Sequence, residues 1–196
     1  MKWYKPFECD NTVKNPLVCD YSNIDEYGFS KWDFVNGELI NNWNDNIIFQ
    51  SKKKKNDGTP DDVLQNHLGL PIYSEKLKNA LIVNRIDGIQ FLKITILLSD
   101  NSQIDGFSIA NFTNFIEALD HDRSKYTRFS DDFPNPNVRG KISGITKFIL
   151  LQRKIIHFDI FRLKDFELRY FVSEKFKKIF DENNFTGYSF EEVELS

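Results

Sequence analysis

Two stretches of this chain carry the same residue pattern 99 positions apart, and this duplication constrains the fold more than any other feature. Residues 72–81 correspond to residues 171–180, and both stretches contain Ser-Glu-Lys. The register continues without a gap, so that Ile86, Gly88, Ile89, Phe91 and Ile94 correspond to Phe185, Gly187, Tyr188, Phe190 and Val193. Each copy predicts a short apolar strand, a helix capped by serine, a glycine turn and an alternating strand. The shared residues are apolar, capping or turn residues, so the duplication predicts scaffold and no catalytic site.

The rest of the chain favours an α+β fold of mostly antiparallel sheets with a few helices, built around the duplicated strand–helix–strand unit at about 70–98 and 168–195. With 196 residues, 40% of them hydrophobic and 19 of them Phe, the chain can bury one sizeable core. We therefore expect a single domain over residues 1–196, with the internal repeat at 70–95 and 169–194.

Strand patterns occur outside the repeats as well. Asn36-Gly37 predicts a hairpin over residues 34–40, because this dipeptide supplies the positive φ of a tight turn. Further predicted strands are 47–49, the antiparallel pair 89–98 and 106–112, 145–151 and 155–163. Two polar segments rich in turn residues, 51–62 and 120–140, predict exposed loops.

Composition argues against several classes of function. A net charge of −3 gives no basic field for a phosphate backbone, so direct nucleic-acid binding is disfavoured. Membrane association is also disfavoured, because no apolar run approaches the roughly 20 residues of a spanning helix. The N-terminus lacks a signal-peptide pattern, so a cytoplasmic location is expected, in which Cys9 and Cys19 are free thiols.

Motifs for catalysis are missing, since the chain has no P-loop, nucleophile elbow, dinucleotide fingerprint or His-Glu-x-x-His helix. We therefore predict no catalytic residue, no metal ligand and no cofactor. An alternative is a small divalent-metal-dependent hydrolase or nuclease that uses Asp120, His121 and Asp122. For Arg162 we predict a structural role, in which its guanidinium either caps carbonyl groups or pairs with a buried acid such as Asp159 or Asp120.

Several short motifs together resemble a family of bacterial immunity proteins from polymorphic toxin systems. The motifs are Leu70-Pro71-Ile72-Tyr73-Ser74-Glu75-Lys76-Leu77, Ile109-Ala110-Asn111, Ala118-Leu119-Asp120 with Ser124, Ile160-Phe161-Arg162-Leu163, Phe171-Val172-Ser173-Glu174-Lys175 and Gly187-Tyr188-Ser189-Phe190. The resemblance covers roughly residues 30–195 and implies a non-enzymatic protein that binds and blocks a cognate secreted or contact-delivered toxin. Analogy with such systems adds a nuclease as one candidate for that toxin.

The two predicted loops are the expected site of partner contacts, because the repeats themselves are scaffold. Acidic loops of an inhibitor can cover the basic cleft of a nuclease and speed its association. The predicted contact residues are Asp61, Asp62, Asp122, Asp131, Asp132 and Phe133. A generic protein-interaction module without a toxin partner remains an alternative.

Overall fold

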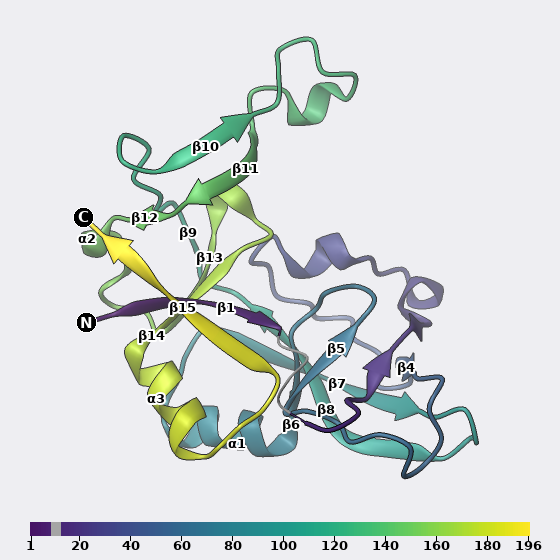
Figure 1. Cartoon of the computed structure of the whole chain (residues 1–196). Coiled ribbons are helices and arrows are strands. Elements are labelled where there is room, and N and C mark those ends of the chain that lie inside the picture. The colour runs from purple at the N-terminus through teal and green to yellow at the C-terminus, as the bar shows by residue number, and fades with distance from the viewer. Residues whose placement is uncertain (9–12) are drawn as a thin grey trace.

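The computed structural model describes residues 1–8 and 13–196, and it confirms the α+β class with mostly β-structure (Figure 1). The main strands are β1 (Trp3–Glu8), β4 (Ile48–Gln50), β5 (Val63–Asn66), β6 (Ile72–Ser74), β7 (Ile89–Leu97), β8 (Gln103–Phe112), β10 (Lys125–Arg128), β11 (Ile142–Lys147), β13 (Ile160–Leu163), β14 (Tyr170–Ser173) and β15 (Tyr188–Leu195). Two-residue strands are β2 (Val18–Cys19), β3 (Tyr21–Ser22), β9 (Phe115–Ile116) and β12 (Ile149–Leu150). The helices are α1 (Glu75–Val83), α2 (Gln152–Ile155) and α3 (Glu174–Glu182), with 3₁₀ turns η1 (Ile24–Tyr27), η2 (Lys31–Phe34), η3 (Pro136–Val138) and η4 (Lys164–Phe166).

The first sheet has seven strands in the order β2-β5-β6-β8-β7-β4-β3 and is nearly closed into a barrel. Its two end strands, β2 and β3, are consecutive in the chain and separated only by Asp20. Cys19 pairs with Asn66 on one side, and Tyr21 pairs with Gln50 on the other. A single stretch of backbone therefore crosses from one edge of the sheet to the other.

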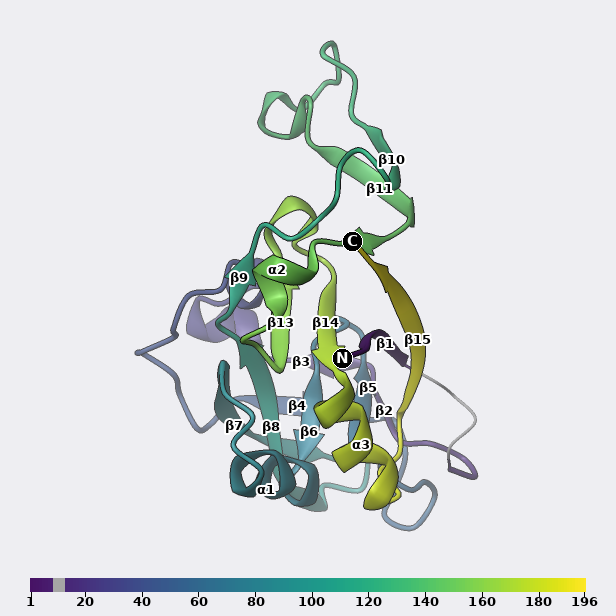
Figure 2. The same cartoon turned by 90° about the vertical axis from the view of Figure 1, so that its left-hand side faces the viewer.

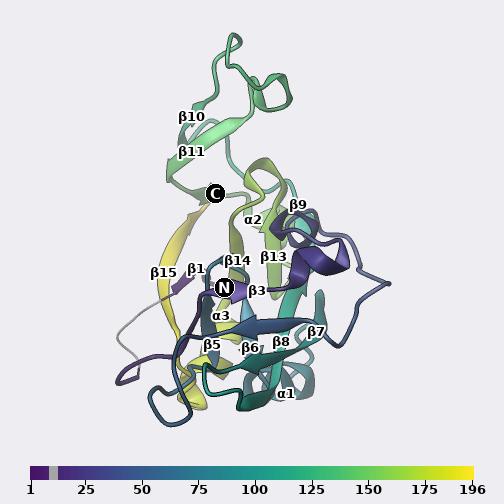
Figure 3. The same cartoon turned by 90° about the vertical axis from the view of Figure 1, so that its right-hand side faces the viewer.

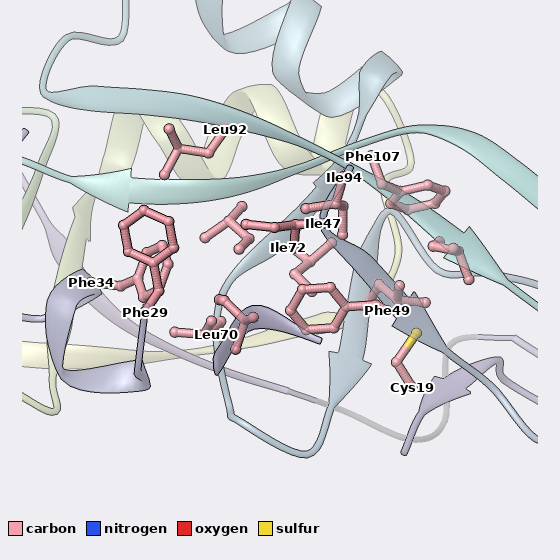
Figure 4. Close-up of a cluster of buried hydrophobic side chains, with 14 of the residues drawn as sticks. Cys19, Phe29, Phe34, Ile47, Phe49, Leu70, Ile72, Leu92, Ile94 and Phe107 are labelled. Atoms are coloured by element: carbon pink, nitrogen blue, oxygen red, sulfur yellow. The ribbon is translucent and has the colours of Figure 1, made fainter. Parts of the chain in front are cut away.

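Apolar side chains fill the interior of this sheet, and Figure 4 shows residues from facing strands pointing toward one another. Phe34, Phe49 and Ile94 are among the buried residues of this cluster. Cys19 is a free thiol buried in the same cluster, and burial raises its pKa to about 12. Cys9 lies outside the described residues.

The second sheet has six strands in the order β12-β15-β1-β14-β13-β9. Strand β1, at the N-terminus, lies between β14 and β15, which come from the last third of the chain. Trp3 on β1 is fully buried, and its ring lies 5.1 Å from that of Phe161, centroid to centroid. The N-terminal segment is thus an integral part of the second sheet.

The duplicated strand–helix–strand unit is confirmed. Helices α1 and α3 begin one residue after Ser74 and Ser173, and each serine hydroxyl accepts a hydrogen bond from the backbone N–H three residues later. The following strands, β7 and β15, begin directly after Gly88 and Gly187, which both have positive φ. The two helices contact each other and lie at the same end of the molecule (Figure 2).

The structure extends the repeat by one more strand at its N-terminal end. Strand β5 pairs with β6 in the same antiparallel register in which β13 pairs with β14. Asp62 precedes β5 and Asp159 precedes β13, and each carboxylate accepts a hydrogen bond from the capping serine of its own unit. The aspartate and serine are 12 residues apart in the first unit and 14 in the second, so this part does not align in the sequence.

Two local predictions were wrong. Residues 34–40 form no hairpin: Gly37 has positive φ, but the segment is held by the side chain of Gln90, which hydrogen bonds to both backbone groups of Ile40. The strand predicted over 155–163 begins only at Ile160, because α2 ends at Ile155 and a turn follows it. At Ile40 a docked side chain fixes the backbone, whereas before Ile160 the backbone is fixed by local hydrogen bonds of the helix and turn, such as that from the Phe158 N–H to the Ile155 carbonyl.

The segment predicted as a loop at 120–140 contains β10 and η3. Strand β10 pairs with β11 in a two-stranded sheet, and this hairpin stands away from the rest of the molecule (Figures 1 and 3). Its tip, residues 129–141, is closed by reciprocal backbone hydrogen bonds of Phe129 with Gly140 and Lys141. The hairpin lies at the end of the molecule opposite to α1 and α3.

Candidate partner-binding cleft under the projecting hairpin

A cleft of about 790 Å³ lies between the projecting hairpin and the body of the protein. The hairpin contributes residues of β10, β11 and the tip. The body contributes Trp32 of η2, His121, and residues 164–168, which form η4 and the two residues after it. Its apolar lining residues are Trp32, Phe129, Val138, Ile142, Phe166 and Leu168. Because the walls come from segments distant in the sequence, this concave surface exists only in the folded chain.

Trp32 is the most prominent apolar side chain of the cleft. It is 55% exposed, although large aromatic side chains are usually mostly buried. A capping box fixes η2: Ser30 accepts a hydrogen bond from the Trp32 N–H, and the Asp33 carboxylate accepts one from the Ser30 N–H. The Lys31 ammonium lies 4.8 Å from the centre of the indole ring. The cap thus holds the indole on the surface by local hydrogen bonds.

The charged lining residues of the cleft are mainly basic. The basic residues are Arg128, Arg139, Lys141 and Lys164, and the acidic residues are Asp165 and Glu167. The two guanidinium groups are positioned by the tip itself, since Arg128 donates to the Gly140 carbonyl at 2.6 Å and Arg139 to the Phe133 carbonyl at 2.7 Å. These bonds fix the arginines while leaving further N–H donors on each.

The basic residues on the body side are held by ion pairs. The Lys164 ammonium lies 2.8 Å from the Glu117 carboxylate, and this hydrogen bond raises the pKa of Lys164. The same bond lowers the pKa of Glu117. The Asp165 carboxylate lies 3.0 Å from Nε2 of His121. These contacts connect the η4 turn with the segment that enters the hairpin.

The predicted contact residues at the tip lie outside the cleft lining. Asp131 and Asp132 are exposed, and the hydrogen bond from Ser130 lowers the pKa of Asp132. Phe133 is 36% exposed and packs on Phe129, with ring centroids 4.7 Å apart. The tip therefore carries an acidic end and an aromatic pair, while the inner side of the hairpin is basic.

Asp120, His121 and Asp122 do not come together as ligands. The Asp120 carboxylate accepts hydrogen bonds from the backbone N–H groups of Asp122 and Arg123, each at 3.1 Å, and a hydrogen bond with Ser196 lowers its pKa. The His121 ring instead contacts Asp165. Among the described residues, no group of three or more His, Cys, Asp or Glu side chains has the geometry of a metal site.

The sequence model of the Imm11 immunity protein family matches residues 4–195. The chain belongs to the Imm11 immunity protein family. The match confirms the resemblance drawn from the sequence, and an immunity protein implies a toxin as its partner. No curated protein matches this Imm11 chain. In the described ranges 1–8 and 13–196, none of its helices has the length and apolar character needed to cross a bilayer.

Of the predicted contact residues of this Imm11 chain, Asp61 is buried and Asp62 is partly buried and hydrogen bonded within the fold. Asp61 is 2% exposed. The Asp62 carboxylate accepts hydrogen bonds from the Ser74 hydroxyl at 2.6 Å and from the Thr186 N–H at 3.2 Å. Asp62 thus joins the first repeat to the loop before β15 of the second. The surface residues of the prediction are Asp122, Asp131, Asp132 and Phe133.

Arg162 of the Imm11 chain has a structural role. It is 3% exposed, donates to the carbonyl of Glu167 at 2.8 Å and lies over the rings of Tyr170 and Phe112. This agrees with the predicted carbonyl cap, whereas Asp159 instead bonds to Ser173 and Lys175. Burial lowers the pKa of Arg162.

The sequence analysis did not predict three residues of the Imm11 cleft, namely Trp32, Lys141 and Leu168. The spacing Ser30 to Asp33 is a readable helix-start signal and could have placed Trp32 at a helix N-terminus. No local signal distinguishes this exposed tryptophan from a buried one, because its exposure depends on how η2 sits against the rest of the chain.

Proposed function

We propose that this Imm11 protein binds a cognate bacterial toxin, secreted or contact-delivered, and neutralises it by stoichiometric inhibition in the cytoplasm of the producing cell. The match to an immunity protein family over residues 4–195 carries this proposal. Inhibition takes place without catalysis: the protein occupies a surface of the toxin and is not turned over.

The projecting hairpin and the cleft beneath it form the contact surface in this proposal. A hairpin that stands away from the body can enter a depression on a partner, and an exposed aromatic residue such as Trp32 is a typical anchor of an interface. Asp122, Asp131, Asp132 and Phe133 contribute from the outer side. A specific complex of this kind buries about 1,600 Å² in total.

The test is coexpression with the toxin domain encoded next to this chain. The proposal predicts that growth is restored, that the purified proteins form a 1:1 complex in calorimetry, and that residual toxin activity falls linearly to zero at equal concentrations. A chelator should leave this inhibition unchanged.

Two results would contradict the proposal. One is failure of the two folded proteins to bind. The other is complete protection at far less than one equivalent of this protein, because that would require turnover and would favour the metal-dependent hydrolase alternative.

A further inference from the structure

We propose that the cleft under the hairpin receives an acidic segment of the toxin with an apolar or aromatic side chain at its centre. This inference rests on the proposed function and names the chemistry of the partner at that same site. It differs from the expectation based on net charge: the chain is acidic overall, at −3, but the concave part of its candidate interface is basic.

The shape and lining of the cleft fit a peptide segment. At about 790 Å³ it is within the size range of binding pockets, which is roughly 300–1,000 Å³, and it is open to solvent along the hairpin. Trp32, Phe129 and Leu168 provide apolar walls on both sides. An apolar side chain inserted between them would remove the exposed indole from water.

The charged residues around these walls determine which net charge of a bound segment is favoured. Arg128, Arg139 and Lys141 come from the hairpin and Lys164 from the body, so a segment in the cleft has cationic groups on two sides. Of the lining carboxylates, Asp165 already contacts His121. Like charges placed in such a cleft would repel, so a carboxylate-bearing segment is favoured over a basic one.

The arginines are also preorganised for this role. Each guanidinium donates one hydrogen bond to a backbone carbonyl of the tip: Arg128 bonds to Gly140 and Arg139 bonds to Phe133. A guanidinium has five N–H donors, so each retains donors for a carboxylate oxygen. Because the bonds that fix the arginines also fold the tip, little side-chain entropy is lost when a partner binds.

A charge-reversal pair tests the proposal. Lys141→Glu places a negative charge in the cleft, and Lys76→Glu makes the same change on the exposed face of α1 at the opposite end of the molecule. The probe is the neighbouring toxin domain with its active residue inactivated. We expect Lys141→Glu to weaken binding about tenfold at low salt, with the difference shrinking as salt rises. The affinity of Lys76→Glu should remain within about twofold of that of the unmodified protein. Lys141→Arg, which keeps the positive charge, should retain binding.

A second measurement follows Trp32 directly. Of the three tryptophans, Trp3 is fully buried, Trp43 is partly buried with its indole N–H bound to the Lys93 carbonyl, and Trp32 is 55% exposed, so Trp32 is the indole most accessible to acrylamide in the free protein. Toxin binding should reduce this quenching, and the reduction should disappear in Trp32→Phe. The same assay with a single-stranded oligonucleotide in place of the toxin should show no saturable protection.

The outcomes separate the two proposals. If the unmodified protein does not bind the toxin, the proposed function fails. If it binds, but Lys141→Glu and Lys76→Glu bind equally well and Trp32 remains accessible, the immunity function stands and the acidic-segment assignment is wrong. Saturable protection of Trp32 by the oligonucleotide, with none by the toxin, would overturn the assignment in favour of a nucleic-acid ligand.

Discussion

The hydroxyl of Ser74 donates a hydrogen bond to the carboxylate of Asp62 across 2.6 Å, and this contact recurs in the second repeat between Ser173 and Asp159 at 2.7 Å. In both units the backbone N–H of the serine also donates to the backbone carbonyl of the same aspartate, at 2.8 Å. The aspartate therefore fixes both the position and the hydroxyl direction of the residue that begins the helix. The repeat is thus a unit of hairpin, capped helix and strand, joined at its start by an Asp–Ser pair.

Removing one cap should destabilise the fold measurably. Ser173→Ala deletes the acceptor for the Phe176 N–H and a hydrogen-bond donor to Asp159, so the free energy of unfolding should fall by about 1–2 kcal/mol. Urea denaturation measures the change, with Ser99→Ala on the exposed turn after β7 as the control. Equal effects of the two substitutions would show that the cap contributes nothing.

Gly187 should tolerate alanine much less well than Gly28. Both have positive φ, at +100° and +81°, which costs an alanine about 1 kcal/mol or more. A Cβ at Gly187 would also lie within 2.4 Å of the Val63 carbonyl oxygen, whereas nothing lies within 4 Å at Gly28. We expect Gly187→Ala to reduce the free energy of unfolding by about 2 kcal/mol more than Gly28→Ala in parallel denaturation curves. Similar losses would mean that the backbone around β5 yields without strain.

Three tyrosine hydroxyls between the two repeats should make the protein sensitive to alkali. Tyr188 lies 2.5 Å from the hydroxyl of Tyr170 and 3.3 Å from that of Tyr73. Burial raises the pKa of Tyr170 from 10.0 to about 12, and it raises the pKa values of Tyr73 and Tyr188 well above 10.0. The neutral form is thus favoured in the folded state. The stability that these groups contribute is fully present below pH 10 and is lost as pH rises toward 12 and beyond.

The measurement is the free energy of unfolding between pH 9 and pH 12, combined with tyrosinate absorbance. Above pH 10, each raised tyrosine adds up to about 1.4 kcal/mol per pH unit to the downward slope. Tyr170→Phe should make the slope shallower, whatever its effect on stability at neutral pH. An unchanged slope in this variant would mean that Tyr170 ionises normally in the folded protein.

The acids of the hairpin tip should affect how fast the toxin is captured. Asp131→Asn with Asp132→Asn removes two exposed negative charges, so association should slow about threefold to tenfold at low salt if this tip approaches a basic region of the toxin. Stopped-flow mixing measures the rate. Asp45→Asn with Asp87→Asn makes the same change in net charge elsewhere on the exposed surface. If both pairs slow association equally, only the overall charge of the protein matters and the tip has no special role.

Local signals predicted the repeat because its determinants are close together in the chain. Ser173 caps the helix that starts at the next residue, Gly187 ends the turn before the next strand, and the apolar spacing of Phe176 and Phe180 defines the buried face. The Asp–Ser contact was not predictable in the same way, because hairpin loops of different length separate the two residues. Asp62 was therefore expected on the surface although it bonds to Ser74.

The Asn36-Gly37 signal shows the limit of such local information. Gly37 adopts the positive φ that the dipeptide favours, at +79°. A hairpin also needs two strands that pair, and here Gln90 and Asn111 bind the backbone of residues 38–40 from the neighbouring sheet. A turn can be correct in its dihedral angles while the segments on either side of it are held by other contacts.

The amino-acid sequence by itself determined the α+β class, the duplicated helices with their serine caps, and the resemblance to immunity proteins. These depend on spacing within about 25 residues or on motifs in a fixed order. Only the tertiary structure decided where the cleft lies and what charge it has, since Trp32 and Lys141 are brought together from opposite parts of the chain. Net charge is a sum over all residues, whereas the field in a cleft depends on which of them fold to the same place.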